Sequence, residues 1–123
     1  MTVFRMGASA LLVAGMLAGV ALVPAAAFAD GAIAANRHGQ AGISYRFKLP
    51  SDAERRALHA CGKGDCRIVA HFRKRCAALA SGDNGHFGYS ARPQQRDADT
   101  VAVNECHSSG GGAACAVKVR GCD

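Results

Sequence analysis

Histidine is the side chain best suited to acid–base chemistry near neutral pH, and this 123-residue chain has five of them. A catalytic histidine needs a partner held within hydrogen-bond reach. No serine-nucleophile motif, zinc-protease motif or phosphate-binding loop accompanies any histidine here. We therefore predict no catalytic residue among them. The histidines are His38, His59, His71, His86 and His107.

Six cysteines could serve either as disulfide partners or as ligands of a structural zinc ion. Zinc sites commonly pair their cysteines as Cys-x-x-Cys, and no such pair occurs in this sequence, which also argues against a redox-active site. An even number of cysteines in an exported chain favours disulfides. We predict three disulfides, no metal site and no cofactor. The cysteines are Cys61, Cys66, Cys76, Cys106, Cys115 and Cys122.

Residues 1–29 have the order of a cleaved secretory signal peptide. Arg5 supplies a positive start, an apolar segment follows at residues 8–23, and Ala27-Phe28-Ala29 gives the small-x-small site that a signal peptidase cuts. A membrane anchor is the alternative, but glycines interrupt a segment that is barely long enough to span. We predict that Asp30 is the first mature residue and that the protein is secreted, periplasmic or at the cell envelope. No second apolar segment exists, so we expect no transmembrane segment after cleavage.

Basic residues outnumber acidic ones by 15 to 9, which gives a formal net charge of +6 at pH 7. The densest group is Arg73-Lys74-Arg75, a few residues after Arg67. Four positive charges near one strand end predict a binding site for phosphate, an acidic glycan or another anionic surface of the envelope. A solvated turn is the alternative. Specific nucleic-acid binding would need aromatic platforms beside the charges, and only Phe72 lies near, so we do not expect it.

The two halves of the chain that follow the signal repeat each other. A shift of 46 residues places Gly42 on Gly88, and a shift of 45 places Cys61 on Cys106. The other cysteines then match in order, which chance agreement among abundant Ala and Gly does not explain well. Two units predict a compact pseudo-symmetric domain, since a solenoid needs three or more. The units cover about residues 31–76 and 77–122.

Each unit has the same predicted order of elements: a short apolar strand, a Gly-rich turn, a second strand, a helix and a third strand. Apolar residues that alternate with polar ones, such as Ile43, Tyr45 and Phe47, predict strands, whereas glycine clusters predict turns. The predicted strands are 32–35, 43–47 and 68–72 in the first unit, and 77–80, 87–90 and 115–119 in the second.

The first predicted helix has clear boundaries. Ser51 and Glu54 have the spacing of a capping box, and Gly62 follows the last helical residue as a stop signal. One face of each helix carries only small residues, which allows the helix to lie close to a sheet. These faces are Ala53, Ala57 and Cys61 in the first helix and Ala98, Ala102 and Cys106 in the second.

The predicted fold class is α+β: a pseudo-symmetric duplication of a ββαβ unit, with about six short strands in one sheet and two helices on one face. It forms a single disulfide-stapled domain over residues 30–123, which we expect to be a monomer. The repeat predicts the local bridges Cys61–Cys66 and Cys106–Cys115, which leaves Cys76–Cys122 as a long bridge between the units. The main rival exchanges a local bridge for one between units.

Several of these motifs together resemble a known family. They are Gly-Ala-Ile-Ala at residues 31–34, the Asp-Ala-x-x-x-Ala-Leu-x-x-Cys pattern at 52–61, Cys66, the Cys-Ala-Ala-Leu-Ala segment at 76–80, and a weaker second copy that ends at Cys122. The chain is similar over residues 31–122 to the family called domain of unknown function 4189, found in small exported bacterial proteins. It departs from that pattern in having no Trp near its Gly-rich segments. The resemblance implies no activity and no catalytic residue.

We therefore expect a small secreted, disulfide-stabilised, non-catalytic interaction or binding module, whose partner is a protein or an anionic polymer of the envelope. The alternative is a small basic secreted hydrolase such as a ribonuclease. Such an enzyme would need histidines and basic side chains that converge in one cleft.

Overall fold

The computed structural model describes residues 30–123, so the expected signal peptide at residues 1–29 lies outside the described residues. The ββαβ order occurs twice, which confirms the predicted α+β class and its repeat. The first unit contains β1 (Asp30–Ala35), β2 (Ala41–Phe47), α1 (Pro50–Cys61) and β3 (Arg67–Phe72). The second contains β4 (Cys76–Ser81), β5 (Phe87–Arg92), α2 (Gln95–Ser108) and β6 (Ala116–Cys122), with short 3-10 turns at Asp83–Gly85 and Gly112–Ala114.

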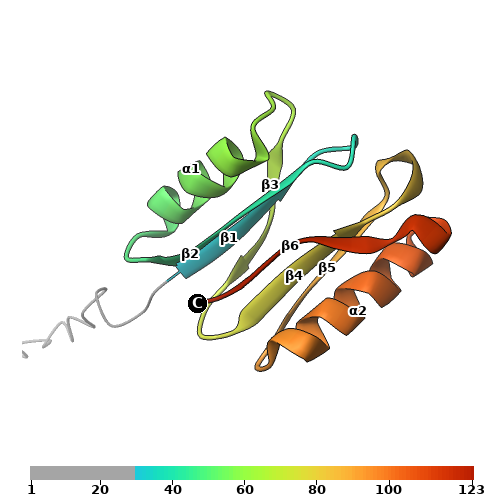
Figure 1. Ribbon diagram of the computed structural model, residues 1–123. Helices are drawn as coiled ribbons and strands as arrows, with labels where there is room; N and C mark the ends of the chain where they lie inside the picture. The colour runs from blue at the N-terminus through green and yellow to red at the C-terminus, as the bar shows by residue number, and fades with distance from the viewer. Residues whose placement is uncertain (1–29) are drawn as a thin grey trace, which may run out of the picture.

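Two three-stranded sheets pack face to face. The strand order is β2-β1-β3 in the first sheet and β5-β4-β6 in the second, and every pairing is antiparallel. Helix α1 covers the outer face of the first sheet and α2 covers that of the second, which gives four layers (Figure 1). Apolar side chains from the two inner faces form the middle of the core.

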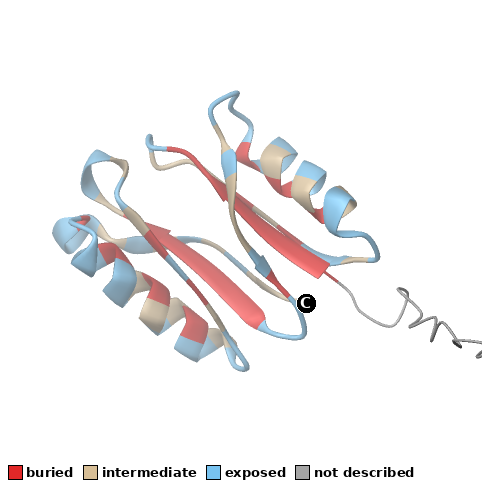
Figure 2. Ribbon diagram, turned by 180° about the vertical axis from the view of Figure 1, so that it is seen from behind, coloured by how far each residue is buried: buried red, intermediate tan, exposed pale blue. Residues whose placement is uncertain are grey.

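The central strands β1 and β4 are covered on both faces. All six residues of each are buried, and they form the two buried bands in Figure 2. Ala32 and Ala34 face α1, whereas Ile33 faces the other sheet. Leu79 occupies the equivalent position in the second unit, and both side chains are fully buried. Burial of each stabilises the fold by about 1.5–3 kcal/mol.

The expectation of one six-stranded sheet with both helices on one face is wrong. A single sheet with helices on one side would leave its other face, with Ile33, Phe72 and Leu79, in contact with water. Stacking two small sheets buries these side chains together. Each unit therefore builds its own sheet and helix, and each covers the inner face of the other.

Small residues bring each helix close to its sheet, as their spacing predicts. The predicted small-residue faces of both helices are buried. A Cβ atom on Gly42 of β2 would stand 2.2 Å from the Ala57 carbonyl oxygen of α1. A Cβ atom on the equivalent Gly88 would stand 2.3 Å from the Cys106 nitrogen of α2. Glycine is therefore required at both positions, because no side chain fits between strand and helix.

Helix α1 begins at Pro50, before the predicted capping box. Leu49 is the N-cap residue and no side chain among the described residues caps the helix, so the capping-box interpretation is wrong. Proline suits the first helical position because its fixed φ fits the helix and it has no N–H to leave unsatisfied. The predicted stop at Gly62 is confirmed: its φ is 80°, and its N–H donates to the Leu58 carbonyl.

Phe47 does not continue the alternation predicted for residues 43–47. The register of β2 against β1 shifts before Phe47, and Arg46 adopts a φ of 65°. This bulge turns Phe47 to the outer face, where it packs with the core under α1. The period-two pattern fails here because a bulge changes the face to which the next residue points.

Three disulfides use all six cysteines, and their pairs are those that the repeat predicts. Cys61–Cys66 and Cys106–Cys115 join the end of each helix to the segment before its third strand. The expectation that Cys76–Cys122 joins the two units is wrong, because both cysteines lie within the second sheet, where they pair across β4 and β6. Within residues 30–123, no helix has the length and apolar character needed to cross a membrane.

Candidate functional site

The exposed residues Arg73, Lys74 and Arg75, here called the basic turn, connect β3 to β4. Arg73 forms an ion pair with Asp30 at 2.7 Å. The Lys74 N–H donates to the Asp123 carboxylate at 3.0 Å, and the Asp123 N–H donates to the Arg75 carbonyl at 2.9 Å. The fold therefore fixes the backbone of the basic turn and keeps its three residues at the surface.

Arg67 does not lie with the basic turn. It pairs with Ala35 at the end of β1, whereas Phe72, next to the basic turn, pairs with Gly31 near the start of β1. The predicted group of four charges near one strand end is therefore wrong in its arrangement. Three of the charges follow β3, and Arg67 begins it.

All five histidines are exposed. His71 Nε2 lies 2.7 Å from a carboxylate oxygen of Glu54, and His38 Nε2 lies 3.4 Å from one of Asp65. Three of the cavities described along residues 30–123 are lined by a histidine, each by a different one. In the same residues, no group of three or more His, Cys, Asp or Glu side chains is arranged to hold a metal ion.

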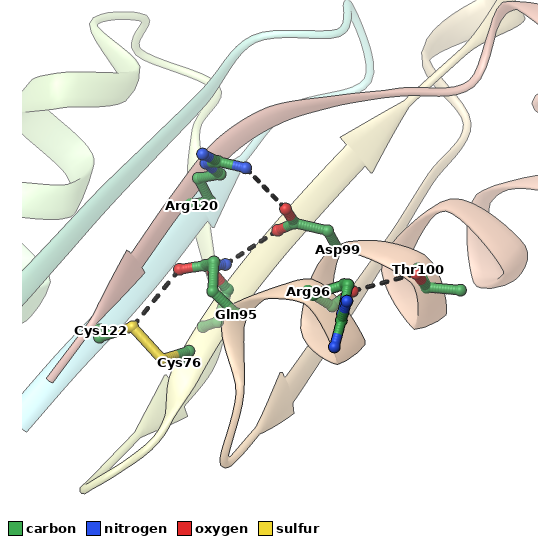
Figure 3. Close-up of polar contacts among 8 residues, drawn as sticks. Cys76, Gln95, Arg96, Asp99, Thr100, Arg120 and Cys122 are labelled. Carbon is green, nitrogen blue, oxygen red and sulfur yellow. Dashed lines mark hydrogen bonds and ion pairs between the residues drawn. A yellow bond between two sulfur atoms is a disulfide. The ribbon is translucent and has the colours of Figure 1, made fainter.

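The contact between His71 and Glu54 has a counterpart in the second unit. The strand registers place Arg120 at the position of His71. Arg120 Nη1 donates to Asp99 Oδ2 at 2.8 Å (Figure 3). Each pair joins a helix to the third strand of its own unit. The recurrence indicates a structural role for His71, because an arginine that cannot act as an acid or base serves in the same place.

Gln95 extends the second pair toward the disulfide of the second sheet. Its Nε2 donates to Asp99 Oδ1 at 2.8 Å and to the Ala77 carbonyl at 3.0 Å. Its Oε1 lies 3.5 Å from Cys122 Sγ (Figure 3). The first turn of α2 is thus connected by side chains to both β4 and β6.

The two stacked sheets are closed along one side. Strand β2 lies beside β6 there, and the ring of Tyr45 covers Gly121, where a Cβ atom would stand 2.5 Å from the ring. The Arg46 N–H also donates to Asp123 Oδ1 at 2.8 Å across this side. These contacts join the last residues of the second unit to β2 of the first.

The opposite side, between β3 and β5, contains two cavities of about 310 and 380 Å³. The larger one is here called the seam pocket, and it is lined by residues of both units. Arg67 and Val69 come from β3, Phe87 comes from β5, and Arg37 and Asp65 come from turns of the first unit. Sequence reasoning singled out Arg67 but missed Arg37, because the two are thirty residues apart and only a neighbouring Gly-rich turn marked the region.

Comparison with known proteins gives a family and a fold. Residues 31–122 match the model of a family described as Domain of unknown function (DUF4189). The solved NMR structure of Rv1813c from Mycobacterium tuberculosis is similar to this chain, with 23% sequence identity and a TM-score of 0.56. The similarity covers 100% of this chain and 97% of that one, and it supports the fold alone. No curated protein matches the chain.

Proposed function

We propose that this chain, which belongs to the family described as domain of unknown function 4189, is an exported, disulfide-stabilised binding module without catalytic activity. It works at the bacterial envelope or outside the cell. Its partner is a protein or an anionic polymer of the envelope, which it meets through exposed basic residues.

The use of the cysteines carries this proposal. All six form structural disulfides, so no thiol is left as a nucleophile or metal ligand. Disulfides persist in oxidising compartments and are rare in the cytosol. They also suit this domain, because its buried core consists mostly of alanine and a domain this small needs further stabilisation. The chemistry that the cysteines support is that of a stable scaffold.

The environment of the histidines agrees with a binding role. A hydrolase of this size would need histidines and basic side chains that converge in one cleft. Among residues 30–123, His71 shares a cavity with Arg92, and His38 and His86 each share one with Arg37, but no two histidines share a cavity. His71 is also engaged by Glu54, in a pair that recurs as Arg120 and Asp99 in the second unit. His38 is engaged by Asp65 at the surface.

The basic turn is the surface that we propose for an anionic partner. Its three residues are exposed, and Asp123 holds its backbone. A group of exposed charges attracts anions mainly through long-range electrostatics, which has little geometric specificity. Binding is therefore weak, prefers anionic over neutral polymers, and falls as salt screens the charges.

Retention of the oxidised protein on a dextran sulfate resin tests this proposal. The variant K74S/R75S removes two charges but keeps Arg73, because Arg73 pairs with the buried Asp30. We expect the parent to be retained at about 0.01 M salt and released near 0.15 M, where the Debye length falls to about 8 Å. K74S/R75S should elute at clearly lower salt than the parent.

The variant R56S/R96S is the matched control, since it removes two charges from exposed positions on the two helices. It should elute close to the parent. Equal retention of K74S/R75S and the parent would contradict the role of the basic turn. Hydrolysis of RNA by the oxidised protein that disappears in His38→Ala or His86→Ala would contradict a non-catalytic function.

A further inference from the structure

We propose that the seam pocket between β3 and β5 binds a small amphiphilic anion: a single carboxylate or phosphate headgroup on a short apolar chain. This inference goes beyond the proposed function, since it concerns a different surface from the basic turn and a small molecule rather than a polymer. It rests on the composition of the pocket, on the partners of its one acidic residue, and on a comparison between the two repeat units.

The pocket combines an apolar floor with a basic rim. Ala35, Val69 and Phe87 supply the apolar surface, and Arg37 and Arg67 stand at the exposed edge. Val69 reaches this position because β3 bulges there: Ala34 pairs with Ile68 and Ile33 with Ala70, which leaves Val69 as the extra residue. Bulges redirect side chains in this way at sheet edges. Apolar surface below and positive charge above match an amphiphilic anion.

The acidic residue in the wall is engaged by other partners. One oxygen of Asp65 accepts a hydrogen bond from Asn36 Nδ2 at 3.1 Å, and the other lies 3.4 Å from His38 Nε2. Asn36 is itself buried, and its Oδ1 accepts the N–H groups of His38 and Gln40. Asp65 therefore supports the turn that carries Arg37. Guanidinium groups bind carboxylate and phosphate well because both anions accept two parallel hydrogen bonds.

The second unit shows that the fold does not require this pocket. Features that the scaffold needs recur in both units, such as Gly42 with Gly88 under the helices and Ile33 with Leu79 between the sheets. The pocket residues do not recur. By the strand registers, Ala41 is the repeat equivalent of Phe87, and Ala116 is the repeat equivalent of Arg67. The shift of 46 places Asp83 at the position of Arg37.

The same registers place Lys118, the bulge residue of β6, at the position of Val69. The equivalent place in the second unit thus has Asp83 and Ala116 where the pocket has Arg37 and Arg67, and it has the basic Lys118 where the pocket has the apolar Val69. Packing alone does not explain an arginine pair above an apolar floor on one side only. A volume of about 380 Å³ lies at the small end of ligand pockets, which suits a ligand of modest size.

Titration of the oxidised protein with octanoate, followed by backbone amide shifts, tests the proposal. We expect saturable shifts at Val69 and Phe87. Octanol, which lacks the charge, and acetate, which lacks the chain, should each bind at least about tenfold more weakly. Octyl phosphate distinguishes the two headgroups, and binding of either anionic amphiphile in this pocket meets the proposal.

The variant R37Q/R67Q should weaken octanoate binding by about tenfold or more, whereas R56Q/R96Q, with the same loss of charge on the helices, should stay within about twofold of the parent. Amide dispersion equal to that of the parent verifies that each variant is folded. Unchanged octanoate affinity in R37Q/R67Q, or shifts centred on the basic turn, would overturn the proposal. K74S/R75S should bind octanoate normally, so failure here and failure of the resin experiment are separate results.

Discussion

At the scale of single residues, the duplication places pairs of side chains in equivalent positions where their hydrogen bonding differs. Ser44 and Ser90 are both buried where the second strand of each unit meets its helix. Ser44 Oγ donates to the Ala53 carbonyl at 2.6 Å. Ser90 Oγ is buried without a hydrogen-bond partner among the described residues. A buried hydroxyl that is unpaired costs stability, and one that is paired adds a little.

We therefore expect opposite results from the two alanine variants. Ser44→Ala should destabilise the fold by about 1 kcal/mol, because it leaves the Ala53 carbonyl without that donor. Ser90→Ala should be neutral or slightly stabilising, because it removes a buried hydroxyl that has no hydrogen-bond partner within residues 30–123. Urea unfolding of both variants measures the difference. A larger loss in Ser90→Ala than in Ser44→Ala would contradict the assignment of these two environments.

A close approach of strand and helix gives a second residue-scale prediction. Gly42→Ala should destabilise the fold by about 1–3 kcal/mol, the usual cost of overpacking, because the new methyl group would meet the backbone of α1. Gly64→Ala is the control, since no atom of the part of the chain that the structure describes lies within 4 Å of a Cβ atom there. Thermal unfolding compares the two. Equal melting temperatures for Gly42→Ala and the parent would show that α1 is not held this closely.

At the scale of elements, the sequence predicted what depends on local pattern and missed what depends on a single backbone irregularity. The small-residue helix faces and the stop at Gly62 follow from spacing and glycine chemistry, and both are observed. The predicted start of α1 is wrong because two helix-start signals lie side by side. The helix begins at Pro50, so Ser51 is already inside it and does not act as the N-cap residue. The predicted face of Phe47 is wrong because Arg46 interrupts the strand with a positive φ. An arginine at that position does not signal such a conformation.

The three disulfides should differ in how much they stabilise the fold. In the chain-entropy model the effect grows with loop length, and the sequence separations are 5 for Cys61–Cys66, 9 for Cys106–Cys115 and 46 for Cys76–Cys122. Replacing each pair by alanine should cost about 2, 3 and 4 kcal/mol in that order. Denaturant unfolding of the three double variants checks the ranking. A smallest loss for the Cys76–Cys122 pair would contradict it.

At the scale of the whole molecule, the sequence predicted the repeat but not how the two units assemble. A strand such as β1, apolar on both faces, is equally compatible with one wide sheet under a second layer and with two stacked sheets. The decision depends on which edges pair, and the edge strands carry no local signal for that. The seam pocket was missed for the same reason, because Arg37, Arg67 and Phe87 meet only after the sheets stack.

The central claim is that the protein is an exported scaffold in which each unit has its own local disulfide. Intact-mass analysis and non-reducing peptide mapping of the exported protein test this claim most directly. We expect a chain that begins at Asp30 and has no free thiol. Trypsin cuts after Lys63, so Cys61–Cys66 should appear as two linked peptides, while Cys106–Cys115 stays within one peptide. Retention of Met1, a free thiol, or a link from Cys61 to any cysteine other than Cys66 would contradict it.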